Sequence, residues 1–77
     1  MPRYFFDIRD ATGVHTDDVG LELADMNTAI VEARRALADM TRETLLGGDD
    51  TQLNILIRDG ADGPVKLAVS LTTERPA

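Results

Sequence analysis

The sequence predicts an α+β fold in two layers, with a four-stranded antiparallel sheet and one long helix packed on one of its faces. Apolar residues recur every three or four positions over residues 26–46, which places them on one stripe of a helix. Before and after this stretch, apolar residues alternate with polar ones, as in strands that bury one face. Because a lone helix cannot bury its own stripe, the flanking strands supply the surface that it covers.

Two strands are expected before the helix. Residues 3–9 alternate and form the first strand, and residues 10–13 carry turn chemistry that closes a short hairpin. Residues 14–16 then run back beside the first strand. Residues 17–20 interrupt this second strand as a turn or a bulge. Residues 21–23 return to alternation, and Leu21 and Leu23 are expected to tuck under the start of the helix.

The ends of the helix have recognisable signals. Asp25 is the expected N-cap, because its carboxylate accepts from free backbone N–H groups and its charge suits the positive end of the helix dipole. Gly47 and Gly48 are expected to end the helix, since glycine readily takes the left-handed conformation there.

Two strands are expected after the helix, over residues 51–58 and 65–71, joined by a loop of turn formers. The preferred order in space is 2-1-3-4, fully antiparallel. The alternative order, 2-1-4-3, puts parallel neighbours at the centre. The whole chain, residues 1–77, is expected to be one small domain whose C-terminal tail, about residues 73–77, frays.

Composition limits the possible functions. The 77 residues contain 8 Lys and Arg against 14 Asp and Glu, a net charge of −6, so phosphate backbones are repelled and no nucleic-acid partner is expected. The chain has no cysteine, which rules out disulfides and thiolate zinc sites and suits a reducing cytosol. We find neither a signal-peptide pattern nor an apolar stretch of the roughly 20 residues that a membrane span needs. A soluble, cytoplasmic protein without a membrane partner is therefore expected.

Acidic side chains are the most numerous candidates for chemistry. Asp7, Asp10, Asp17 and Asp18, with His15, could meet near the first hairpin and bind a divalent cation or a small ligand. Their spacing does not match that of an EF-hand, and aspartate in a turn usually hydrogen-bonds its own backbone. We therefore expect turn aspartates and a solvated histidine on a short edge strand, with no metal site, no cofactor and no catalytic residues. Metal or ligand binding remains the alternative function.

The open face of the sheet is the candidate interface. If the first strand turns Tyr4 toward the helix, Phe5 points away from it, and Leu56 and Ala68 fall on the same outer face. Apolar residues on an uncovered sheet face can mark a partner surface. We expect a non-enzymatic interaction or regulatory module that self-associates, most simply as a homodimer, through this open face or through an edge strand.

Three segments carry a resemblance to a known family. They are Met-Pro-Arg-Tyr-Phe-Phe-Asp-Ile-Arg-Asp at residues 1–10, Asp-Asp-Val-Gly-Leu-Glu-Leu at residues 17–23, and the alanine-rich part of the helix at residues 29–38. Together they resemble a family of short bacterial proteins classed as a domain of unknown function. The resemblance implies a small stand-alone domain, and it brings no catalytic residues with it.

A second resemblance is to the antitoxin lobe of HicB-type toxin–antitoxin pairs, which also has an N-terminal hairpin, an Asp/Gly-containing loop and an alanine-rich helix. This chain departs from that lobe by having two strands after the helix and no appended DNA-binding module. By analogy of fold, the likeness implies an antitoxin-like, partner-binding role.

Overall fold

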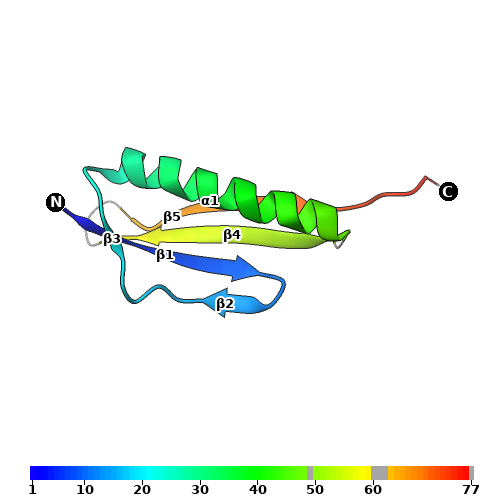
Figure 1. Cartoon of the computed structure of the whole chain (residues 1–77), viewed down its shortest axis with the longest axis horizontal. Coiled ribbons are helices and arrows are strands. Elements are labelled where there is room, and N and C mark those ends of the chain that lie inside the picture. Colours follow the sequence, from blue (N-terminus) through cyan, green and yellow to red (C-terminus); the bar gives the residue numbers. More distant parts are fainter. Residues whose placement is uncertain (49, 60–62, 77) are drawn as a thin grey trace.

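The computed structural model describes residues 1–48, 50–59 and 63–76. One helix lies along one face of an antiparallel sheet, as expected (Figure 1). In chain order the elements are β1 (Arg3–Asp10), β2 (Gly13–His15), β3 (Leu21–Glu22), α1 (Met26–Gly47), β4 (Thr51–Arg58) and β5 (Val65–Leu71). Residues 60–62 of the expected loop between the last two strands lie outside the described residues.

The sheet has five strands, which corrects the expected four. Its main path is β2-β1-β4-β5, and the additional strand β3 pairs with β1 beside β2. In β3, Glu22 lies opposite Arg3 and Leu21 opposite Tyr4. Alternation does return at residues 21–23, but two residues are too few for this pattern to identify a separate strand.

The segment before the helix also differs from expectation. Strand β2 begins and ends one residue earlier than residues 14–16. Leu23 packs against the core, but Leu21 lies on β3 and is 47% exposed rather than tucked under the helix. Backbone pairing of Leu21 with Tyr4 holds it at the sheet edge.

The ends of α1 follow the expected signals. The Asp25 carboxylate accepts hydrogen bonds from the backbone N–H and the hydroxyl of Thr28, both at 2.8 Å. At the other end Gly48 has a φ of 84°, and its N–H donates to the Thr44 carbonyl. Both caps satisfy backbone groups that the helix itself leaves unpaired.

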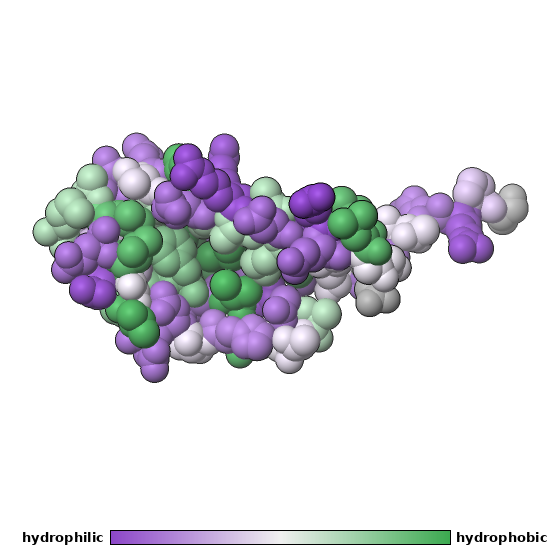
Figure 2. Space-filling model, viewed as in Figure 1, coloured by the Kyte–Doolittle hydropathy of each residue, from purple (hydrophilic) through white to green (hydrophobic). Residues whose placement is uncertain are grey.

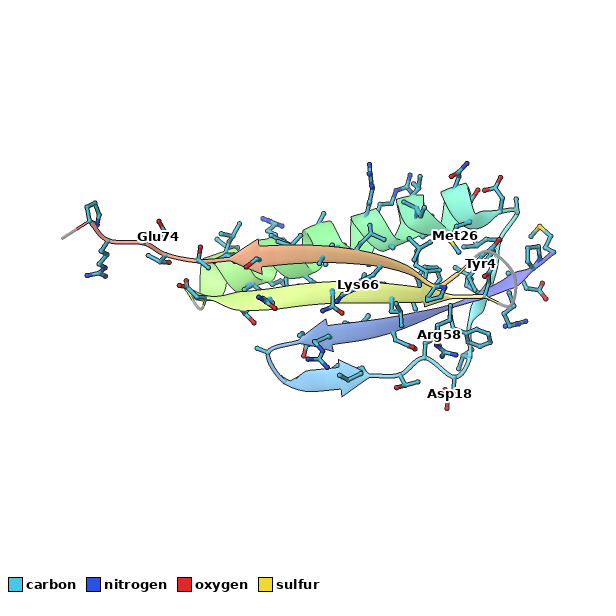
Figure 3. The ribbon with its side chains drawn as sticks, turned by 180° about the vertical axis from the view of Figure 1, so that it is seen from behind. Tyr4, Asp18, Met26, Arg58, Lys66 and Glu74 are labelled. Carbon is cyan, nitrogen blue, oxygen red and sulfur yellow. The ribbon has the colours of Figure 1, made fainter. Side chains whose placement is uncertain are left out.

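The core lies between α1 and the inward faces of β1, β4 and β5. Its buried residues come from alternate strand positions and from one stripe of the helix, which packs mainly on β4 and β5: they are Tyr4, Ala29, Ala33, Leu37, Leu53, Ile55 and Ile57. The alanines let the helix backbone approach the sheet closely. The opposite face of the sheet is left uncovered by the helix (Figure 3).

Two further features concern the surface. Near the C-terminus, the backbone N–H and the hydroxyl of Thr73 both donate to the Asp50 carboxylate at 2.7 Å, which ties the start of the tail to the segment after α1. Among the residues described, no helix is long and apolar enough to cross a membrane.

Candidate functional site

The three candidate interface residues lie on the uncovered face of the sheet, along one diagonal across β1, β4 and β5. A charged or amide side chain stands directly opposite each of them, in the pairs Phe5–Arg58, Leu56–Asp7 and Ala68–Asn54. A hollow of about 440 Å³ on this face is also lined mostly by polar groups, including Arg9 and Lys66. The structure therefore places the three residues on one face without joining them into a continuous apolar surface.

Asp7 and Arg58 form an ion pair on this face. The Arg58 Nε donates to one Asp7 carboxylate oxygen at 2.6 Å, and its Nη2 donates to the other at 3.1 Å. This two-point geometry is the strong form of an arginine–carboxylate pair. The hydrogen bonds from Arg58 hold the pKa of Asp7 below its ordinary value of 3.8, so the carboxylate stays ionised.

Asp17 fills a gap along the outer edge of β1. Between the segments where β2 and β3 pair with β1, the Phe6 N–H donates to the Asp17 carboxylate at 3.0 Å. The other Asp17 oxygen accepts from the N–H groups of Val19 and Gly20, both at 3.0 Å. These N–H donors, led by that of Phe6, lower the pKa of Asp17. The Asp17 carboxylate therefore accepts the hydrogen bond from the Phe6 N–H that a backbone carbonyl of a continuous strand would have accepted.

The ion pair belongs to one network with residues 16–20, the segment between β2 and β3 that we call the Asp17 loop. The Asp17 N–H donates to Asp7 at 2.9 Å, and the Arg58 Nη2 donates to the Asp17 carbonyl, also at 2.9 Å. The Arg58 guanidinium lies over the Phe5 ring, 5.1 Å from its centroid. A Cβ built on Gly20 would approach the same ring to 2.9 Å. Phe5 is thus covered from two sides by its own chain.

The acidic candidates from the sequence separate into two groups. Asp10 accepts from the N–H and hydroxyl of Thr12, which lower its pKa, and its Oδ1 lies 3.3 Å from the His15 Nε2. Asp7 and Asp17 belong to the Arg58 network, and Asp18 joins neither group. Within the described ranges, no three His, Asp or Glu side chains come together in a group that could hold a metal ion. The turn interpretation fits Asp10, whose partners lie two to five residues away in the chain.

An apolar groove that sequence reasoning missed lies between α1 and β5. It has a volume of about 730 Å³. Its lining includes Leu45 and Leu46, which are 59% and 78% exposed, and Leu67 and Val69 of β5. Figure 2 shows an apolar patch on the surface near the C-terminal end of α1. The missed signal was the placement of Leu45 and Leu46 outside the core stripe, because adjacent exposed apolar residues can mark an interaction site.

The rim of this groove is basic although the chain is acidic. Arg34 and Arg42 line it, and neither has a carboxylate partner among the residues the structure describes. Their long apolar stems can cover the groove while the guanidinium groups stay in water.

The edge of β5 is the open edge of the sheet. Strand β5 pairs with β4 on one side, and no described strand pairs with its other side. Its seven residues contain no proline and only one charged residue, Lys66. The opposite edge is formed by the short strands β2 and β3 with the Asp17 loop between them. Another strand can be added to an edge strand that is long and regular, has no proline and carries few charged residues.

Comparison with known proteins gives one result. Residues 3–72 match a family described as Domain of unknown function (DUF6894). No curated protein and no solved structure gives a match. Since the match spans most of the chain, from β1 to the end of β5, this protein belongs to the DUF6894 family.

Proposed function

We propose that this chain is a non-enzymatic interaction module that self-associates through the free edge of β5. The observation that carries the proposal is the coincidence of two features on one side of the molecule. The unpaired edge of β5 offers backbone donors and acceptors, and the groove beside it offers exposed leucines. Strand addition combines both, because main-chain hydrogen bonds and side-chain pockets act together.

The state of the carboxylates on the open face supports a non-enzymatic role. A general acid or base near neutral pH needs a pKa close to the working pH and room for a substrate proton. Asp7 and Asp17 have lowered pKa values, and their oxygens accept hydrogen bonds from Arg58 and from backbone N–H groups. Such groups hold a loop in place and are unsuited to proton transfer.

The choice of the β5 edge over the open face follows from what covers each surface. On the open face, Phe5 is already covered by Arg58 and approached by Gly20. In the groove, by contrast, Leu45 and Leu46 are left exposed. More apolar area is therefore available for burial at the β5 side.

Light scattering across a concentration series tests the proposal. We expect the mass to rise toward twice the 8.4 kDa of one chain. The Leu45→Glu variant should weaken the dimer by about 100-fold or more, because a two-fold interface loses this side chain twice and each buried leucine contributes about 1.5–3 kcal/mol.

Val19→Glu is the matched control, since Val19 is also exposed, at 72%, but lies on the Asp17 loop and not in the groove. It makes the same change of charge and should leave association unaffected. A wild-type chain that stays monomeric at about millimolar concentration, where even weak interfaces assemble, would overturn the proposal. So would equal effects of the two substitutions.

A further inference from the structure

The direction of the backbone groups along β5 follows from one hydrogen bond on β1. The Phe6 N–H donates to the Asp17 carboxylate, so the backbone N–H and C=O groups of Phe6 point away from β4. Along a strand, successive residues direct their N–H and C=O groups to opposite sides. The β1 residues that bond to β4 are therefore Phe5, Asp7 and Arg9, and their partners on β4 are Arg58, Leu56 and Asn54.

The same alternation continues across β4 to β5. The remaining residues of β4 bond to β5, and the register pairs them with Val65, Leu67, Val69 and Leu71. The intervening β5 residues direct their N–H and C=O groups to the free edge. These are Lys66, Ala68 and Ser70.

This pattern restricts how a second copy can add to the edge. In an antiparallel pair, edge-directed residues must stand opposite each other to exchange hydrogen bonds. With Ala68 on the two-fold axis, Ala68 faces its own copy and Lys66 faces Ser70 in both directions. That arrangement uses all the edge-directed groups of both strands. An axis at Leu67 leaves the edge-directed groups of Ser70 unpaired. An axis at Val69 leaves those of Lys66 unpaired.

We propose that two copies join β5 to β5 antiparallel, with Ala68 on the two-fold axis, so that the two sheets become one continuous sheet. This arrangement rests on the proposed self-association and adds its geometry. It places Lys66 opposite a neutral serine, and it avoids setting like charges directly opposite each other, which destabilises a strand pair. On the helix side, Leu67 of each copy meets Val69 of the other.

The two-fold axis also brings the two grooves together. An axis perpendicular to the sheet keeps both copies of α1 on the same face. Because α1 packs on β4 and β5 and strands are about 4.8 Å apart, the two helix axes lie about 10–14 Å apart. Long side chains on two helices meet at this separation. Leu45 is then covered by the second copy, while Arg34 and Arg42 keep their charged ends at the rim.

The available area is sufficient for a small dimer. A seven-residue strand is about 24 Å long, and the sheet and helix layers together are about 20 Å thick. The side of each copy along β5 therefore has a flat area of roughly 500 Å². The total of about 1,000 Å², before counting surface relief, reaches the lower limit for a specific interface.

Single-cysteine cross-linking tests the arrangement, because the natural chain has no cysteine. Residues in a hydrogen-bonded antiparallel pair have Cα atoms about 5.5 Å apart, which suits a disulfide. Under mild oxidation, Ala68→Cys should form a covalent dimer on a non-reducing gel. Lys66→Cys alone and Ser70→Cys alone should not, because each lies about 14 Å from its own copy. Mixed together, these two variants should cross-link to each other.

Light scattering on the same samples separates the two levels of the proposal. A dimer that cross-links best through Lys66→Cys, or that fails to cross-link through Ala68→Cys, overturns this register and leaves self-association standing. A monomer at all concentrations overturns both levels, the register and the self-association. Circular dichroism of each variant confirms that the fold is retained.

Discussion

Gly20 is a position where the Asp17 loop lies close against β1, and replacing it tests how that loop packs. Gly20 has a φ of 76°, and a Cβ built there would lie 2.8 Å from the Arg3 Cγ and 2.9 Å from the Phe5 Cε1. Gly20→Ala therefore has two costs, one for the left-handed backbone and one for overpacking. We expect about 1–2 kcal/mol for the first and about 1–3 kcal/mol for the second.

Gly48→Ala separates these two costs. Gly48 has nearly the same φ, 84°, but nothing lies within 4 Å of its Cβ position. Its replacement should cost only the backbone strain, so Gly20→Ala should be destabilised by about 1–3 kcal/mol more. Combining Gly20→Ala with Phe5→Leu removes a clashing ring atom and should recover part of the difference.

Urea unfolding followed by circular dichroism measures both losses, at one protein concentration because association shifts apparent stability. If Gly20→Ala loses no more free energy of unfolding than Gly48→Ala, the loop does not lie against Arg3 and Phe5, and the account of a covered Phe5 fails.

Two further predictions concern pH and the core. The pKa values of Asp7 and Asp17 are lowered in the folded chain, so their contribution to stability is fully present above the ordinary value of 3.8 and is lost as pH falls through the folded values. Melting temperatures recorded from pH 7 to strong acid should drop in that window, and Asp17→Asn should flatten the drop; an unchanged acid profile in that variant would contradict this role. Ile55→Ala should cost about 2–5 kcal/mol in urea unfolding, and Leu56→Ala on the open face should cost less, because Ile55 is buried and Leu56 is only partly covered. Equal losses would mean that the two faces are assigned wrongly.

Much of the fold could be predicted because its signals are local. The helix and its caps follow from apolar spacing, Asp25 and Gly48, and the inward faces of the long strands follow from alternation. Strand β3 could not be predicted in this way. Its pairing with β1 depends on how the Asp17 side chain shapes the preceding loop, which is a contact across the chain rather than a pattern along it.

The surface was harder to predict than the core. Sequence alternation placed Phe5, Leu56 and Ala68 on one face, and the register agrees. Alternation cannot show that Arg58, distant in sequence, lies over Phe5 and covers part of its ring. Nor can it show that Leu45 and Leu46 lie beside a free strand edge, because that depends on which side of the helix faces β5.

Amide hydrogen exchange as a function of protein concentration tests the central claim most directly. If β5 pairs with β5, the N–H groups of Lys66, Ala68 and Ser70 become more slowly exchanging as the concentration rises through the dimerisation range. Those of Leu67 and Val69, already bonded to β4, change much less. Self-association that leaves the exchange of Lys66, Ala68 and Ser70 unchanged would contradict the account, because the two copies would then meet through some other surface.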